Sequence, residues 1–271
     1  MRHICCVSGG KDSAALALHL QDKYPALPME YVFTDTGHEL PEVQDYLAVL
    51  TTKLGKTIVQ LTDGFCGECL ERGLQSVAGG QYACLACGTI GPRGAMMVTD
   101  FDYWLGTWDF GPSPASRWCT KTLKIRPLER FLKGRDATVY LAIRADEQRT
   151  GNYGLAANVE YRYPLHDDGI DLKGVFKILK DHGLSLPEFY RWRTVGGCYD
   201  CFFQNKRDWF GLKRTHPALF QEALETEQRK GFTYGAIPLH VIQAQQELPM
   251  EIEEGDLDDY EGSMPCLICA K

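Results

Sequence analysis

The chain has 271 residues, of which 44% are hydrophobic, and a formal net charge of −7. This length is large for one domain and small for two, and the hydrophobic fraction excludes a wholly disordered chain. Segment 251–261 holds seven acidic residues and no Lys or Arg, so the rest of the chain is close to neutral. A dedicated duplex-DNA binder, which usually carries a basic face, is therefore not expected.

No apolar run approaches the length needed to span a bilayer, and the chain starts directly with a loop motif rather than a signal peptide. We therefore expect a cytoplasmic protein with no membrane association.

The N-terminal part of the chain alternates between two periodicities. Short apolar runs predict buried strands, and stretches with helical spacing separate them. The predicted strands cover residues 3–7, 29–34, 57–61 and 137–143, and the predicted helices cover 14–20, 41–54, 171–182 and 217–229. Such alternation is typical of an α/β fold with a parallel sheet and right-handed crossovers.

Composition divides the chain into regions with different expected roles. We expect an α/β core, an inserted subdomain that is rich in Gly, Cys and Pro and needs a metal for order, a helical C-terminal region, and an acidic tail. These regions are 1–61 with 117–150, then 62–116, 151–250 and 251–271.

Cysteine is unusually abundant, with eleven residues and no export signal, so a disulfide framework is not expected. Eight of them form C-x-x-C pairs, a spacing that lets two thiolates hold one metal ion: Cys66/Cys69, Cys84/Cys87, Cys198/Cys201 and Cys266/Cys269. The first two pairs flank 14 residues, which favours a structural zinc site over a sulfur relay or reduced thiols. The last pair could supply extra ligands or carry a persulfide, and Cys5 and Cys6 are expected to be small buried side chains.

The segment Ser8–Ser13 (SGGKDS) lies between the first predicted strand and the first predicted helix. Its glycines allow close approach of an anion to the backbone, and the N–H groups at a helix start bind phosphate. Lys11 adds a positive charge, while Asp12 could bind Mg²⁺ or cap the helix. The spacing is not that of a Walker P-loop.

This segment resembles the SGGxDS signature of PP-loop ATP pyrophosphatases. Further stretches resemble the phosphoadenosine phosphosulfate reductase branch of that family, in family order: 33–41 (FTDTGHELP), 119–128 (CTKTLKIRPL), 143–147 (IRADE) with Arg149, 197–201 (GCYDC) and 216–220 (HPALF). The resemblance implies an adenine nucleotide alpha hydrolase-like fold, ATP and Mg²⁺ as ligands, and cleavage of ATP to AMP and pyrophosphate.

Two features depart from the sulfonucleotide reductases. Their double cysteine appears here as Cys119-Thr120, and their terminal ECGLH nucleophile is absent. The chain therefore most resembles the ATP-pyrophosphatase component of bacterial DNA phosphorothioation systems of the Dnd or Ssp type. That resemblance implies sulfur supplied by a cysteine desulfurase, DNA as substrate within a multi-protein complex, and a possible homodimer. A sulfonucleotide reductase, a tRNA thiolation enzyme and a non-enzymatic zinc scaffold remain as alternatives.

The candidate site residues follow from the motifs and the resemblance. Predicted catalytic residues are Lys11, Asp12 and Cys119, and predicted ATP-binding residues are Ser8, Gly9, Gly10, Lys11, Asp12, Ser13, Asp35 and Arg144. Lys124 and Arg149 are predicted to bind a substrate phosphate. Predicted metal ligands are Cys66, Cys69, Cys84 and Cys87 for zinc, and Cys119, Cys198 and Cys201 for an iron–sulfur cluster or zinc. The histidines, including His38, show no ligand spacing and are expected to be structural.

Overall fold

The computed structural model describes residues 1–108, 110–148 and 158–246. Its centre is a parallel sheet in the order β3-β2-β1-β8-β9. The strands are β1 (Arg2–Cys6), β2 (Met29–Thr34), β3 (Ile58–Cys66), β8 (Ala137–Tyr140) and β9 (Val159–Arg162). The predicted strand 137–143 does join this sheet, where β8 pairs with β1.

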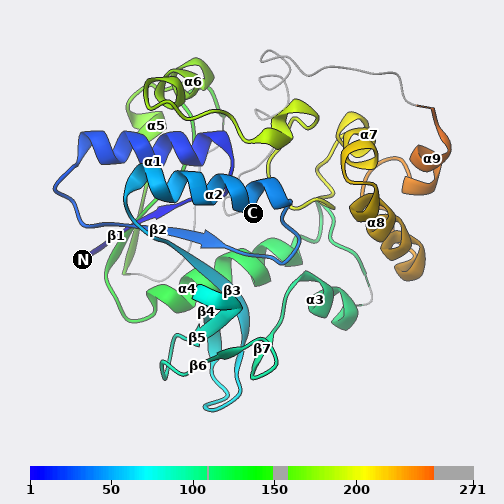
Figure 1. Cartoon of the computed structure of the whole chain (residues 1–271), viewed down its shortest axis with the longest axis horizontal. Helices are drawn as coiled ribbons and strands as arrows, with labels where there is room; N and C mark the ends of the chain where they lie inside the picture. The colour runs from blue at the N-terminus through cyan, green and yellow to red at the C-terminus, as the bar shows by residue number, and fades with distance from the viewer. Residues whose placement is uncertain (109, 149–157, 247–271) are drawn as a thin grey trace.

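Alternating side chains of β1 face two different cores. Cys5 packs in the larger core beneath α1 (Lys11–Lys23) and α2 (Pro41–Leu54), whereas Ile4 and Cys6 pack in the core beneath α4 (Arg126–Leu132). This two-residue period is the normal pleat of a strand buried on both faces. Figure 1 shows α1 and α2 on one face of the sheet and α4 on the other.

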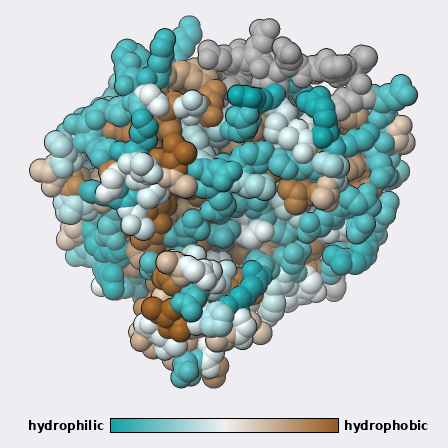
Figure 2. Space-filling model, viewed as in Figure 1, coloured by the Kyte–Doolittle hydropathy of each residue, from teal (hydrophilic) through white to brown (hydrophobic). Residues whose placement is uncertain are grey.

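Residues 62–116 continue the sheet in antiparallel form. β3 runs across the expected boundary at 61/62 and pairs with β4 (Arg72–Val77) and β7 (Met96–Val98). The 3₁₀ turn η1 (Ala78–Gly80) leads to β5 (Gln81–Cys84) and β6 (Ile90–Pro92), and α3 (Phe101–Thr107) closes the segment. We call β4–β7 together with the end of β3 the antiparallel extension. Leu70, Ile90 and Met97 in residues 62–116 are exposed. Figure 2 shows apolar side chains gathered at the lower left of the molecule.

The C-terminal half is mainly helical. Its elements are the π-helix η2 (Thr120–Ile125), which leads into α4, then α5 (Pro164–Asp167), α6 (Leu172–Asp181), the 3₁₀ turn η3 (Glu188–Arg191), α7 (Lys206–Thr215), α8 (Pro217–Lys230) and α9 (Leu239–Ala244). The predicted α/β fold with flanking helices, a cysteine-rich insertion and a helical C-terminal region is thus confirmed. Every helix in the described residues is too short or too polar to cross a membrane.

Candidate functional site

The loop Ser8–Ser13 lies where the direction of the sheet's connections reverses. From β1 the chain proceeds through α1 to β2 on one side, and β8 lies on the other side of β1. Open α/β sheets bind their ligands in the crevice at the carboxyl ends of the strands at such a point. The loop predicted to bind ATP therefore occupies the position at which this fold class binds ligands.

Two serines and two glycines fix the shape of this loop. Ser13 Oγ accepts a hydrogen bond from Ser8 N at 2.9 Å and donates one to Gly10 O at 3.0 Å. This one hydroxyl therefore holds the two ends of the Ser8–Gly10 turn together. Gly9 has φ 73°, and a Cβ there would lie 2.6 Å from Val43 Cγ1. Gly10 is the N-cap of α1, and no side chain in the described residues caps that helix start. The N–H groups in the first turn of a helix have no intrahelical partner and attract an anion.

Cations from both sides of the reversal point converge on Asp12. Lys11 is fully buried, with Nζ 3.3 Å from Asp12 Oδ2 and 5.2 Å from the ring centroid of Tyr190. Arg144, from the segment after β8, places Nη1 3.2 Å from Asp12 Oδ1 and binds Asp146 through Nε and Nη2 at 2.9 and 3.1 Å. Asp12 thus holds the two cations in place, and it does not cap α1 in this structure.

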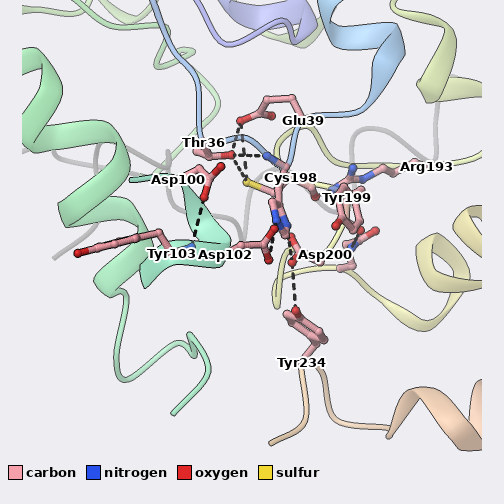
Figure 3. A network of polar contacts seen from close by, with 12 residues as sticks. Thr36, Glu39, Asp100, Asp102, Tyr103, Arg193, Cys198, Tyr199, Asp200 and Tyr234 are labelled. Carbon is pink, nitrogen blue, oxygen red and sulfur yellow. Dashed lines mark hydrogen bonds and ion pairs between the residues drawn. The ribbon is translucent and has the colours of Figure 1, made fainter. Parts of the chain in front are cut away.

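A second group of candidate residues surrounds Lys124. The π-helix η2 presents Lys124, and Cys119 immediately precedes it. Burial lowers the pKa of Lys124, but the negative charge around it, including that of Glu39, outweighs burial and raises that pKa overall. Cys198 Sγ lies 3.2 Å from Thr36 Oγ1 and 3.9 Å from Glu39 Oε1 (Figure 3).

The thiols of this group are held protonated. Burial raises the pKa of Cys119 to about 11 and raises the pKa values of Cys198 and Cys201. The wholly buried Arg193 fixes the loop before Cys201 by donating to Gly197 O at 3.2 Å and Cys198 O at 2.7 Å. Within the described part of the chain, the three sulfur atoms do not converge to within 4.8 Å of one another. The predicted iron–sulfur or zinc site on them stays a prediction.

Asp35 follows β2 directly, at the same carboxyl edge. Its Oδ1 accepts a hydrogen bond from Gly37 N at 2.9 Å, and burial raises its pKa. The charge of Lys124 acts on Asp35 in the opposite direction, so Asp35 lies near the group around Lys124. Of the remaining candidates, Arg149, Cys266 and Cys269 lie outside the described residues.

The four cysteines of the antiparallel extension, in contrast, converge. All four sulfur atoms lie within 4.8 Å of one another, and the Sγ–Sγ distances Cys66–Cys87 and Cys69–Cys84 are both 3.7 Å. A tetrahedral Zn²⁺ site with Zn–S bonds of about 2.3 Å has S–S edges of about 3.8 Å. The donor set and its spacing therefore fit zinc.

The two C-x-x-C turns of this cluster are built alike. Leu70 N donates to Cys66 O and Gly88 N donates to Cys84 O, both at 3.0 Å. The residue after the second cysteine has a positive φ in each turn, 77° at Gly88 and 60° at Leu70. Such a φ is unfavourable for leucine, so the cluster holds Leu70 in a conformation that glycine adopts freely. Hydrogen bonding with Thr89 lowers the pKa of the exposed Cys87 to about 6, which favours the thiolate that metals bind.

His38 was expected to be structural, and the residues that contact it in the structure were not predicted from the sequence. His38 Nδ1 lies 2.9 Å from Asp200 Oδ2, to which the Tyr234 hydroxyl donates at 3.0 Å (Figure 3). Burial lowers the pKa of His38, but Asp200 and Asp102 outweigh it and raise the pKa to about 10. The only sequence signal was proximity to two motifs, because His38 lies within 33–41 and Asp200 lies between two cysteines.

Comparisons with known proteins give distant structural matches. No protein-family model and no curated protein matches the chain. PAPS reductase from Candida auris, solved as a phosphate complex, matches with 13% identity over 69% of this chain and 76% of that chain, at a TM-score of 0.43. FMN adenylyltransferase from Candida glabrata, solved with FMN and the ATP analogue AMPCPP, matches with 11% identity over 73% of this chain and 53% of that chain, at a TM-score of 0.38. Yeast FAD synthetase, solved with FAD, matches with 10% identity over 95% of this chain and 80% of that chain, at a TM-score of 0.40. At such scores the assignment of the site rests on its geometry.

Proposed function

We propose that this chain is an ATP pyrophosphatase that adenylates an oxygen of its substrate so that sulfur can replace that oxygen. We further propose that the substrate is DNA, that the product is a phosphorothioate linkage, and that a cysteine desulfurase supplies the sulfur.

One observation carries the proposal. The Ser8–Ser13 loop lies at the reversal point of the parallel sheet and leads into the N-terminus of α1, and the buried Lys11 and Arg144 meet there at Asp12. A helix N-terminus with two fixed cations matches the charge of a triphosphate tail.

The roles of the residues follow from their positions. The 8–13 loop and Lys11 would hold the β- and γ-phosphates, and Arg144 would neutralise charge that develops during transfer. Bound Mg²⁺ would neutralise the phosphate oxygens further, and Asp12 is the nearest carboxylate for it. The substrate oxygen attacks the α-phosphorus, the bond from that phosphorus to the bridging oxygen breaks, and pyrophosphate leaves with the electron pair.

The group around Lys124 would serve the second step. There, the outer sulfur of a cysteine persulfide attacks the activated centre, and AMP leaves with the electron pair. A second thiol of the same group then attacks the inner sulfur of that persulfide, so that a disulfide forms and the outer sulfur stays on the substrate. Cys119 is our candidate for carrying that sulfur, because it adjoins Lys124, whose positive charge favours a thiolate or persulfide anion and can also hold a substrate phosphate. The four-cysteine cluster would take zinc and hold the antiparallel extension together.

The acceptor is tested by supplying candidate substrates to the purified chain with ATP, Mg²⁺, cysteine and a cysteine desulfurase. Our proposal predicts phosphorothioate dinucleotides in nuclease digests of DNA, detected by mass spectrometry. Thionucleosides in tRNA, or sulfite from a sulfonucleotide with thioredoxin, would contradict the DNA assignment and favour one of the two alternatives. ATP cleavage to AMP and pyrophosphate with none of these products would leave the first step standing and overturn only the acceptor.

A further inference from the structure

A histidine and two carboxylates meet beside the loop that carries Cys198 and Cys201. His38 comes from the turn after β2, Asp102 from α3 and Glu222 from α8, and one ligand atom of each lies within 4.8 Å of the others. His38 Nε2 is 3.4 Å from Asp102 Oδ1.

The imidazole of His38 is held in one orientation. Its ring stacks on Tyr199, with centroids 4.8 Å apart and planes 10° apart, and contacts Phe101 at 4.4 Å. Asp200 Oδ2 lies 2.9 Å from Nδ1, so Nε2 is the nitrogen turned toward Asp102 and Glu222. Metal-binding histidines usually pair their second ring nitrogen with a carboxylate in this way. Figure 3 shows Asp200 with Tyr234 on its far side, which secures that carboxylate in turn.

A cavity gives access to this point. It has a volume of about 680 Å³, and both Asp102 and Glu222 line it. Its wall also carries Glu225, Arg229 and Lys230. An ion could therefore reach the two carboxylates without disturbing the buried histidine.

The charges around His38 favour a cation. The carboxylates of Asp102, Asp200 and Glu222 surround one imidazole, while Arg229 and Arg93 are the cations that act on Asp102. A proton on Nε2 offsets one negative charge, and a divalent ion in its place would offset two.

We propose that His38 Nε2, Asp102 and Glu222 bind one divalent transition-metal ion, with Asp200 orienting the histidine. One imidazole and two carboxylates suit Mn²⁺, Fe²⁺ or Zn²⁺. Binding exchanges the proton on Nε2 for the metal ion and releases that proton to solvent. The ion ties α3 and α8 to the turn after β2, next to the loop that carries Cys198 and Cys201. This site is independent of the proposed ATP chemistry.

The test is Mn²⁺ titration of the full chain carrying one equivalent of zinc, which the four thiols of the cysteine cluster take up first, and kept free of nucleotide. Electron paramagnetic resonance counts the bound Mn²⁺, and electron spin echo modulation detects coupling to an imidazole nitrogen. We expect one tight site per chain with ¹⁴N coupling, and at least tenfold weaker binding in both Asp102→Asn and Glu222→Gln.

Two control variants keep the test specific. Glu225→Gln removes a carboxylate from the same cavity outside the triad, and Asp12→Asn removes the carboxylate at the ATP loop; both should keep wild-type Mn²⁺ binding. Asp102 and Glu222 are exposed, so their variants are expected to fold. The proposal fails if Mn²⁺ does not bind, if binding lacks ¹⁴N coupling, or if Glu225→Gln weakens it as much as Glu222→Gln does.

Discussion

Two regions of the molecule contain groups of cysteines near charged side chains: the carboxyl edge of the parallel strands and the antiparallel extension. The two regions differ in how the chain brings these side chains together. At the edge, Lys11, Lys124 and Arg144 come from distant parts of the chain, and the thiols near them are held protonated. In the extension, four cysteines within one local stretch converge, and the exposed Cys87 ionises easily. The same C-x-x-C spacing thus contributes to a converged four-sulfur cluster in one region, whereas in the other it adds two thiols to the group around Lys124.

This difference suggests a division of labour. Residues gathered by the sheet topology can act together on a ligand in the crevice, whereas the local cluster can only hold its own strands together. Damage at the edge should therefore abolish chemistry while sparing stability, and damage in the extension should do the reverse.

The largest expected contrast lies in the alkylation of two cysteines in protein stripped of metal. Iodoacetamide reacts with the thiolate, so Cys87 should reach half its maximal rate near pH 6, whereas Cys119, with a pKa of about 11, should still be accelerating at pH 10. Peptide mass spectrometry gives both profiles. Added zinc should protect Cys87, but not Cys119, from alkylation. If the alkylation rates of both cysteines had their midpoint near the free-thiol pKa of about 8.5, the contrast would not exist.

The next effect concerns Lys11→Ala. Losing this fixed cation should lower pyrophosphate release at least about a thousandfold, which corresponds to about 4 kcal/mol of transition-state stabilisation. Lys121→Ala removes an exposed lysine and serves as the control with normal activity. Circular dichroism checks that both variants fold. Wild-type activity in a folded Lys11→Ala variant would remove the loop from the mechanism.

Cys69→Ser should reduce zinc affinity by about a hundredfold, because it removes one of four ligands from a closed site. Zinc content measured by mass spectrometry should fall from about one per chain, and the thermal midpoint should fall with it. Cys119→Ser should keep its zinc. Equal zinc loss in both variants would place the metal in the group around Lys124 instead.

The smallest effect is purely structural. Asp63 is fully buried in β3 and accepts hydrogen bonds from Arg72, Thr99, Trp104 and Arg130, tying the extension to α4. Removing its charge in Asp63→Asn should lower the free energy of unfolding by about 3 kcal/mol, measured by urea denaturation. Asp45→Asn, on an exposed face of α2, should change it little. Loss of pyrophosphate release per folded molecule in Asp63→Asn would contradict the separation of the two regions.

Local signals explain how much of the fold could be predicted. The predicted strand 29–34 and helix 41–54 match β2 and α2, since Pro41 opens the helix and Gly55, at φ 62°, ends it. α7 was missed, although Asn205 and Asp208 form a capping box at its start. The continuation of β3 to Cys66 was also missed, because its pairing with β4 and β7 depends on distant segments.

The site divides along the same line. The 8–13 motif and the four-cysteine spacing are local patterns, so both groups could be predicted from the sequence. The convergence of the four sulfur atoms fits zinc. The role of the 8–13 loop in binding ATP remains a proposal. Other contacts depend on tertiary packing between distant elements. Arg144 approaches Asp12 in this way. Three carboxylates likewise approach His38: those of Asp102, Asp200 and Glu222. A single sequence carries no signal for such contacts.

The most direct measurement is a crystal structure of the chain with Mg²⁺ and a non-hydrolysable ATP analogue. The account predicts the triphosphate on the Ser8–Ser13 loop, with its oxygens against the first turn of α1 and beside Lys11 and Arg144. A bound nucleotide at any other place, with that loop empty, would contradict it.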